Sequence, residues 1–317
     1  MNSTPSGLTT GRLNRSKIVR WSVLLLFAMG LLCATSAEFA RRRKISLGRT
    51  WPAADCMSID DIDHRVWDNL LKRYVDDEGN VAYSEWKSTP ADVELLDAYL
   101  AALSRADPAR DASRPARLAF WVNAYNALTI RGILREYPTD SIQNHAARLW
   151  GFNIWRDLLL TVGDAAYSLG QIEHDVLRPL HEPRIHFAIV CASRGCPRLL
   201  NRAYTAWEIE RQLLDNTRNF FADGQKLQFD AATGQLRVSP ILKWYAGDFG
   251  ESETQRLQMI APFLPEGISR QIPGGILGIA YLDYDWSLND QSTPNFAAML
   301  PPDSGPTEGG GAVKEPR

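Results

Sequence analysis

Two cysteines and a histidine lie close together in the segment 184–197, whose sequence is RIHFAIVCASRGCP. The chain has four cysteines and five histidines, so Cys191, Cys196 and His186 are a large share of its reactive side chains. A cysteine thiolate is a nucleophile, and a nearby histidine is the base that activates it. The segment therefore predicts a thiol site, although the same two cysteines also fit a disulfide that closes a short turn.

The apolar run 185–190 predicts a short buried strand that leads into this turn. On a regular strand His186 and Cys191 face opposite sides and lie roughly 16 Å apart, at about 3.3 Å per residue. His174, on a separate predicted helix, is therefore the better catalytic partner for Cys191, and Glu173 is its neighbour. His186 stays a candidate only if the strand ends early or bulges.

Asp285 follows the last predicted strand and has two interpretations. It either orients His174 or His186, which would complete a Cys-His-Asp arrangement, or it caps a turn. Trp286 and Asn289 belong to the same segment and are candidates for binding a ligand or shaping the site.

The turn between the two cysteines offers a site for an anion. Successive backbone N–H groups at Ser193, Arg194 and Gly195 can form a nest for a carboxylate, a phosphate or a developing oxyanion. The Arg194 guanidinium would add a fixed positive charge. An ordinary glycine-containing turn is the alternative interpretation.

The sequence predicts no metal site and no cofactor. Two cysteines supply half of a zinc site, and no second pair of ligands has suitable spacing. The acidic turn 76–80 fails as a calcium loop, because a glycine at its sixth position puts Tyr74 at the first ligand position. The chain has neither a phosphate-binding glycine loop nor a dinucleotide fingerprint.

A long helix over 115–137 is expected to support the thiol site. Apolar residues surround it on all sides, which is typical of a central, buried helix. Asn123 and Asn126 lie three residues apart and share a face. We expect them to hydrogen-bond the loop after Val190 and hold its shape, or else to contact a substrate. Tyr125 either donates a proton or packs in the core.

The other elements follow from periodicity and from turn residues. The sequence predicts helices over 59–74, 90–106, 169–177, 205–222, 241–245 and 252–263, a hairpin of 226–229 with 235–238, and a buried strand over 276–284. The predicted fold class is α+β: a helix-rich single domain around a small, mostly antiparallel sheet with a buried central helix. The order of elements is similar to a papain- or transglutaminase-like core, but this central helix carries no cysteine.

The N-terminal sequence predicts targeting and export. Residues 1–40 read as a signal peptide or an N-terminal membrane anchor, because basic residues flank an apolar run over 21–37. We expect a protein of the cell envelope or periplasm, either released or tethered to the inner membrane by that run. Disulfides are permitted there, and Cys56 would be an odd thiol open to an intermolecular bridge.

The remaining boundaries follow from composition. We expect a linker over 41–58, a single globular domain over 59–300 and a disordered tail over 301–317, which is rich in glycine and proline. The formal net charge of −2 and the scattered arginines give no basic stripe, so nucleic acid is not an expected partner.

Several segments together resemble the family of domain of unknown function 547. They are 120–130, 172–174, 184–197, 243–245 with 248–249, and 284–289. The resemblance covers roughly residues 60–290 and implies no settled reaction. The resemblance to this family implies an exported bacterial protein. Some eukaryotic relatives join this domain to glutaredoxin-like or coiled-coil regions, which would suit thiol chemistry or scaffolding.

Three functions remain open at this point. The first is a non-catalytic envelope module that binds a peptide or a carboxylated ligand in a cleft beside the Cys191–Cys196 turn. The second is a thiol-dependent hydrolase or transferase that uses Cys191 with His174 or His186. The third is a thiol–disulfide redox partner, whose Cys191–Cys196 couple would cycle.

Overall fold

The computed structural model describes residues 44–147, 151–230, 232–270 and 278–292. The predicted leader over 1–40 and the predicted tail over 301–317 lie outside the described residues. The described residues from Ile45 onward belong to one compact unit. Within the described ranges, no helix has the length and apolar character needed to cross a membrane.

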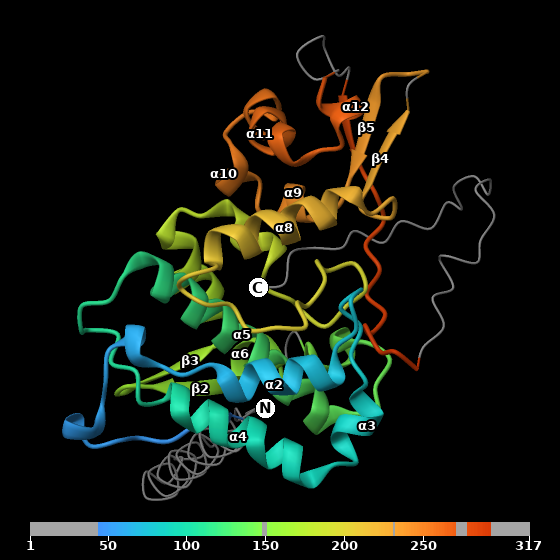
Figure 1. Ribbon diagram of the computed structural model, residues 1–317. Coiled ribbons are helices and arrows are strands. Elements are labelled where there is room, and N and C mark those ends of the chain that lie inside the picture. The colour runs from blue at the N-terminus through green and yellow to red at the C-terminus, as the bar shows by residue number, and fades with distance from the viewer. Residues whose placement is uncertain (1–43, 148–150, 231, 271–277, 293–317) are drawn as a thin grey trace, which may run out of the picture. The chain divides into compact units, whose positions relative to one another are not determined.

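The central helix is α5 (Arg114–Glu136), as predicted. The Ser113 side chain caps it by accepting the Ala116 N–H, and a proline occupies its first turn. Most of its side chains are buried, around its whole circumference. It packs against α4 (Pro90–Leu103) and α8 (Ile209–Ala222), which lie on different sides of it in Figure 1. The helix therefore forms the centre of a helical layer.

Two other helices begin later than the sequence predicted. The predicted helix over 59–74 is a 3₁₀ turn, Ile59–Asp61, followed by α2 (Arg65–Tyr74), because Asp63 accepts the Arg65 N–H and starts a new helix there. Likewise α8 starts at Ile209, since Thr205 Oγ1 accepts the Glu208 N–H in the turn before it. The short helix α3 (Tyr83–Lys87) connects α2 and α4.

The strands form two small mixed sheets rather than one mostly antiparallel sheet. In the first, β2 (Leu158–Val162) pairs in parallel with β1 (Ile45–Leu47) and antiparallel with β3 (Ala165–Ser168). In the second, β5 (Gln235–Val238) pairs antiparallel with β4 (Leu227–Asp230), as the predicted hairpin, and in parallel with β6 (Gly278–Tyr281). The helix-rich α+β fold class is confirmed. β1 lies within residues 41–58, which we predicted as a linker.

The predicted strand over 185–190 is wrong. This stretch is a 3₁₀ helix, Pro183–Phe187, followed by irregular chain. Its backbone groups bond to side chains instead of a neighbouring strand: Asn216 Nδ2 donates to the Phe187 carbonyl, and Asn126 bonds Ala188 and Val190. Because these amides satisfy the buried backbone, the apolar run needs no sheet.

The remaining elements are short helices and turns. They are α6 (Ile154–Asp157), α7 (Leu169–Gln171) with a π-helical segment Ile172–Leu177 and a 3₁₀ turn Arg178–Leu180, α9 (Ile241–Trp244), α10 (Ala246–Phe249), α11 (Glu253–Ile260) and α12 (Glu266–Ser269). The helices predicted over 169–177 and 252–263 are confirmed in outline. The predicted strand over 276–284 is shorter, and its first two residues lie outside the described residues.

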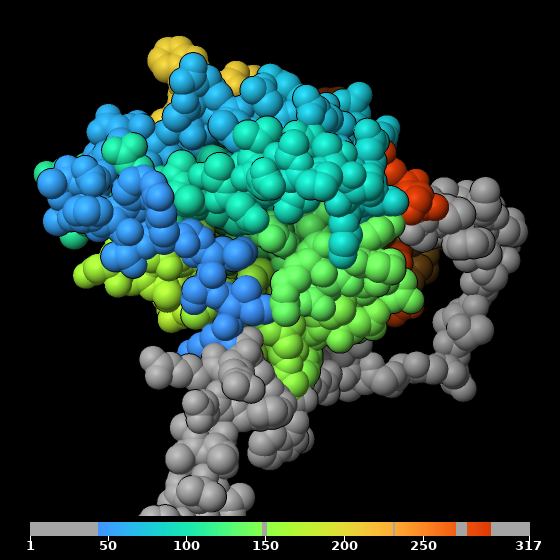
Figure 2. Space-filling model, turned by 90° about the horizontal axis from the view of Figure 1, so that it is seen from below, coloured from blue at the N-terminus to red at the C-terminus, as the bar shows by residue number. Residues whose placement is uncertain are grey.

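The buried apolar residues form two clusters. The larger surrounds α5, and the smaller gathers around Phe187, Phe220 and the second sheet. Tyr284 packs against both. Seen from below, the blue and cyan part of the chain covers one face together with the green segment that follows α5 (Figure 2). The candidate site lies where the two clusters meet.

Candidate functional site

A small cavity of about 40 Å³ brings several of the predicted site residues together. Its walls come from α5, the π-helical segment, the chain that follows the 3₁₀ helix Pro183–Phe187, α9 and the chain after β6. The lining residues are Tyr125, Trp155, Glu173, His186, Ile189, Cys191, Cys196, Pro197, Ile241, Trp244, Tyr245, Tyr284 and Trp286. Six of these were site candidates from the sequence: Tyr125, Glu173, His186, Cys191, Cys196 and Trp286.

The two cysteines are neighbouring free thiols at one wall of this cavity. The backbone N–H of Cys191 donates to Cys196 Sγ at 3.0 Å. Tyr284 Oη lies 3.1 Å from Cys196 Sγ and 3.4 Å from Cys191 Sγ, so one hydroxyl touches both sulfurs. Ser193 Oγ does the same at 3.5 and 3.2 Å. The predicted disulfide is not formed in this arrangement.

The hydrogen bonds favour a negative charge on Cys196 rather than Cys191. Burial by itself would raise the pKa of Cys196. Hydrogen bonds from the Cys191 thiol and N–H and from the hydroxyls of Ser193 and Tyr284 outweigh burial, so the pKa of Cys196 lies below its usual value. The hydrogen bond with Cys196, together with burial, raises the pKa of Cys191. The sequence had named Cys191 as the nucleophile, whereas the donors converge on Cys196.

His186 is the histidine of this site, and its partner is Asp248. His186 Nε2 contacts Asp248 Oδ2 at 2.7 Å, and the ring stacks on Tyr245 with centroids 4.0 Å apart. Its Nδ1 is buried and has no hydrogen-bond partner in the described protein. Because the segment is not a strand, the expected 16 Å separation from Cys191 does not apply. Nδ1 is therefore the ring nitrogen that is not engaged within the described residues.

Arg178 contacts both Asp248 and His174. Arg178 Nε and Nη2 donate to the two oxygens of Asp248 at 2.7 and 2.9 Å. Burial raises the pKa of Asp248, but hydrogen bonds from His186 and Arg178 hold it well below its usual range. Arg178 Nη1 also contacts His174 Nδ1 at 2.9 Å. His174 does not line the cavity, so the preference for it over His186 is wrong.

Glu173 reaches the cavity from the π-helical segment. The residue is 4% exposed, and its Oε1 has no hydrogen-bond partner in the described protein. Tyr125 Oη donates to its Oε2 over 3.4 Å. Burial, followed by the charge of Glu173, raises the pKa of both Tyr125 and Tyr245. Glu173 therefore contributes an acceptor to a wall that otherwise consists largely of aromatic rings.

At two surrounding turns the structure fits the second of the two interpretations that the sequence left open. Asp285 Oδ1 accepts hydrogen bonds from the backbone N–H and hydroxyl of Ser287, so it caps a turn and orients no histidine. The predicted anion nest is not available either. The N–H groups of Arg194, Gly195 and Cys196 all donate to backbone carbonyls.

The three candidate asparagines shape the surrounding chain. Asn126 Nδ2 donates to the Ala188 carbonyl and its Oδ1 accepts the Val190 N–H, which fixes the chain just before Cys191. Asn123 forms the same pair of bonds with the backbone of Tyr204. Asn289 bonds the Tyr83 hydroxyl and the Gly79 carbonyl. Of the two amides predicted to bond the loop after Val190, Asn126 bonds the chain just before Cys191 and Asn123 bonds Tyr204.

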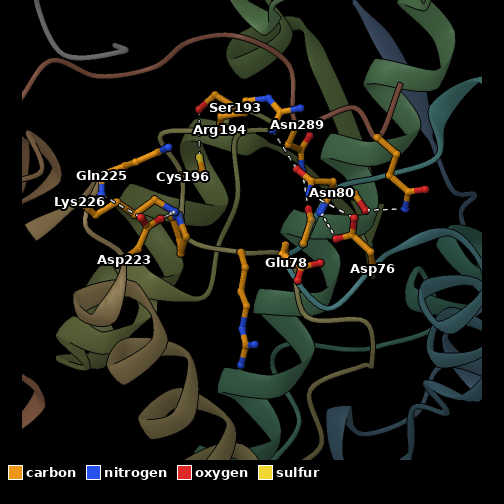
Figure 3. A pocket seen from close by; sticks show the side chains of 14 residues that line it. Asp76, Glu78, Asn80, Ser193, Arg194, Cys196, Asp223, Gln225, Lys226 and Asn289 are labelled. Atoms are coloured by element: carbon orange, nitrogen blue, oxygen red, sulfur yellow. Dashed lines mark hydrogen bonds and ion pairs between the residues drawn. The ribbon is translucent and has the colours of Figure 1, made fainter. Parts of the chain in front are cut away.

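A second, larger cleft of about 510 Å³ meets the small cavity at Cys196 and Pro197, which line both. Figure 3 shows the turn that carries Asp76, Glu78 and Asn80 on one side and Asp223, Gln225 and Lys226 on the other. Ser193, Arg194 and Cys196 lie between them. The further lining residues are Gly79, Pro197, Arg198, Asn289 and Gln291. The cleft is polar and carries charges of both signs, and its volume is within the range of ligand pockets.

Sequence reasoning missed Asp248, Tyr245 and Tyr284 as site residues. A signal was present, since all three belong to the segments that resemble the 547 family. Nothing in those segments indicated which partner each residue would meet. Among the described residues, no group of three or more potential ligands is arranged to hold a metal ion.

The fold and the site define a helix-rich α+β domain with a buried dithiol beside a histidine–aspartate pair. Residues 109–221 match the family described as "Protein of unknown function, DUF547", so the chain carries a DUF547 domain. The match includes α5, Glu173, His186 and both cysteines, while Asp248 and Tyr284 lie beyond it. No curated protein and no solved structure matches the chain.

Proposed function

We propose that this protein is a thiol-dependent hydrolase or transferase that acts on acyl groups. The observation that supports it is that Cys196 and His186 line one small cavity. Hydrogen-bond donors converge on the Cys196 sulfur, and Nδ1 of His186 has no protein partner. A thiolate with a positioned histidine is the arrangement that acyl-transferring cysteine enzymes need.

The proposed reaction has two balanced steps. The Cys196 thiolate attacks the acyl carbon and forms a thioester, while protonated His186 donates a proton from Nδ1 to the leaving group. Water or an acceptor then attacks the thioester, transfers its proton to His186 and releases the thiolate. Asp248 is a positioning residue, because its bond to Nε2 directs Nδ1 toward the cavity and stabilises the imidazolium.

The larger cleft supports a polar substrate. The small cavity holds only a few atoms, so the reacting group enters it while the rest of the molecule occupies the 510 Å³ cleft. Arg194, Arg198 and Lys226 line that cleft together with acidic side chains such as Asp76 and Glu78. This mixture of charges suits a peptide or another carboxylated molecule with polar groups along its length.

The proposal is tested by assaying a panel of chromogenic thioesters, esters and peptide amides. We expect Cys196→Ser and His186→Ala to abolish turnover while far-UV circular dichroism stays unchanged. Cys56→Ser is the matched control and should keep full activity, because Cys56 lies outside both cavities. Full turnover in folded Cys196→Ser, or no turnover by the native protein on any acyl substrate, overturns it.

The second candidate is a non-catalytic module that binds a peptide or carboxylated ligand in the larger cleft. The observation in its favour is the size of this cleft compared with the thiol cavity. Calorimetric titration with short charged peptides should then give the same affinity for the native protein and for Cys191→Ser, because Cys191 lines the small cavity and not the larger cleft. Lys226→Gln should weaken binding, because Lys226 lines the cleft. Equal affinity in Lys226→Gln and the native protein argues against this cleft as the binding site.

For localisation, we propose export to the cell envelope, with residues 21–37 either removed or retained as a tether to the membrane. The basic and apolar pattern of the N-terminal sequence supports this. Cell fractionation with N-terminal sequencing of the mature chain separates the two forms. Recovery of an intact chain from the cytoplasm alone would contradict both.

A further inference from the structure

We infer that Cys196 and Cys191 form a peroxide-reactive dithiol, in which hydrogen peroxide or another small peroxide converts the two thiols into a disulfide. This activity uses the same cysteines as the proposed acyl chemistry and goes beyond it. It does not depend on an acyl substrate. The inference rests on the contacts of the two sulfurs, on the size of the cavity and on the two unpartnered polar atoms in its wall.

The hydrogen bonds to Cys196 Sγ make this thiol the one that is oxidised first. Three donors lie close to its sulfur: the Cys191 N–H at 3.0 Å, Tyr284 Oη at 3.1 Å and Ser193 Oγ at 3.5 Å. A backbone N–H and two hydroxyls stabilise the thiolate over the thiol. The thiolate is the form that attacks a peroxide, so charge stabilisation directs oxidation to this sulfur.

Cys191 is placed to resolve the oxidised form. Its sulfur lies 3.2 Å from Ser193 Oγ and 3.4 Å from Tyr284 Oη, the same two oxygens that contact Cys196 Sγ. Its higher pKa, caused by its hydrogen bond with Cys196 and by burial, keeps it protonated while Cys196 reacts. A protonated thiol beside a sulfenic acid is the pair that condenses to a disulfide.

The cavity fits a small oxidant. A volume of about 40 Å³ admits a molecule with two heavy atoms. Glu173 Oε1 and His186 Nδ1 belong to residues only 4% and 3% exposed, and neither atom has a hydrogen-bond partner in the described protein. Buried polar atoms without partners are rare, and here they offer an acceptor and a proton-exchanging nitrogen to a peroxide.

The reaction balances without any further group. The Cys196 thiolate attacks one peroxide oxygen, the O–O bond breaks, and the second oxygen leaves as hydroxide, which takes the proton that the Cys196 thiol had released and becomes water. Cys196 is then a sulfenic acid. The Cys191 thiol attacks that sulfur and expels the hydroxyl group as a second water, leaving the Cys191–Cys196 disulfide. Two thiols are oxidised by two electrons, and one peroxide is reduced to two waters.

The test uses the reduced full-length chain, hydrogen peroxide, and peptide mapping of each cysteine by mass spectrometry after rapid alkylation. We expect Cys196 to be lost at least about tenfold faster than the reference thiol Cys56 near neutral pH, with Cys191 consumed in step. The linked peptide should lack two hydrogen atoms. Oxidation of Cys196 no faster than Cys56 overturns the inference.

Single variants separate the roles of the two thiols. In Cys191→Ser, Cys196 should accumulate as a sulfenic acid that dimedone traps, whereas in Cys196→Ser the Cys191 thiol should react at the rate of Cys56. Tyr284→Phe keeps the ring and removes one donor, so Cys196 should react several-fold more slowly even if the serine variants fold poorly. A dimedone adduct on Cys191 instead of Cys196 overturns the assignment.

The outcome is independent of the acyl-transfer proposal. Rapid disulfide formation with no turnover of any acyl substrate overturns only the proposed function. Acyl turnover by a protein whose Cys196 resists peroxide overturns only this inference. If both hold, peroxide should abolish acyl turnover and a dithiol reductant should restore it, because the disulfide removes the nucleophile.

Discussion

Asp248 holds His186 through a 2.7 Å contact between Oδ2 and Nε2, although the two residues are 62 positions apart in the chain. The same carboxylate receives two bonds from Arg178. Asp248 lies on α10. It therefore links that helix to Arg178, which follows the π-helical segment, and to the 3₁₀ helix that carries His186. The orientation of the histidine therefore depends on a carboxylate from a distant part of the sequence.

Asp248→Asn should destabilise the fold by about 1–3 kcal/mol, because Arg178 and His186 both lose a charged partner. Hydrogen bonds from these two residues lower the pKa of Asp248 in the folded state, against the effect of burial. Its stabilisation is therefore complete above the ordinary carboxyl pKa of about 4 and is lost as the pH falls through the lower folded value. Urea unfolding between pH 3 and 7, as approximate limits, measures both effects.

Asp175→Asn is the matched control for this variant, since Asp175 is an exposed residue of the π-helical segment. It should change the free energy of unfolding by less than about 0.5 kcal/mol at any pH. A constant difference between Asp248→Asn and the native protein down to the lowest pH would contradict the expected linkage.

Asn126 and Asn123 make the same kind of contact but should differ in their effect on the thiols. Each bonds one carbonyl and one N–H of a distant backbone segment, Asn126 near Cys191 and Asn123 at Tyr204. Alanine at either position leaves buried backbone groups unpaired and should cost about 2–4 kcal/mol. Only Asn126→Ala should also change the alkylation rate of Cys196, because it releases the chain that leads into the dithiol.

Thermal unfolding and timed alkylation of the folded variants check this difference. Asn123→Ala is the control for destabilisation alone. Equal alkylation rates in the two variants would show that Asn126 supports the fold and not the arrangement of the thiols.

The elements that the sequence predicted well are those whose signals are local. α5 is encircled by apolar residues, has a proline in its first turn and ends before Pro138, so its bounds and burial follow from neighbouring residues. The hairpin of β4 and β5 likewise follows from alternation around a turn that contains Gly234.

The sequence predicted several residues of the site but not which of them contact each other. The stretch from Ile185 to Val190 has the apolar content of a strand, yet Asn126 and Asn216 satisfy its backbone from helices elsewhere in the chain. The sequence carries no periodic signal for such contacts. For the same reason it did not pair His186 with Asp248, and so favoured His174. Local patterns indicate which residues are available, while tertiary hydrogen bonds decide which of them meet.

His64 should make the fold sensitive to moderate acid. Burial lowers its pKa to about 4 in the folded protein, against an opposing effect of the Asp63 charge. The unfolded histidine titrates near 6.5, so its stabilising effect is complete above about pH 6.5 and is lost as the pH falls toward 4. The shift corresponds to at most about 3 kcal/mol. His64→Gln should remove this loss while keeping a bond to the Tyr99 hydroxyl, which His64 Nδ1 contacts at 2.7 Å.

Urea unfolding of native protein and His64→Gln over this pH range measures the difference in slope. His181→Asn is the control, because His181 is exposed and asparagine tolerates its left-handed backbone conformation, with φ at 52°. Parallel pH profiles for the native protein and His64→Gln would show that His64 does not cause the acid sensitivity.

Gly79→Ala should destabilise the protein and disturb the larger cleft. Gly79 has a φ of +84°, and an added Cβ would lie 2.6 Å from both the Cβ of Arg198 and the backbone nitrogen of Leu199. Its carbonyl also accepts the Asn289 side chain. Backbone strain and the contact with fixed atoms should together cost about 2–4 kcal/mol in urea unfolding.

Gly224→Ala tests whether the position or merely the loss of a glycine matters. Gly224 adjoins the turn on the opposite side of the cleft, and an added Cβ there meets no atom within 4 Å. Its free energy of unfolding should change by less than about 0.5 kcal/mol. If Gly79→Ala also weakens the binding of a charged peptide while Gly224→Ala does not, the turn 76–80 forms a wall of the ligand site. If both variants lose an equally small amount of unfolding free energy, the chain around Arg198 moves to make room for the added Cβ. Gly79 would then not fix this wall of the cleft.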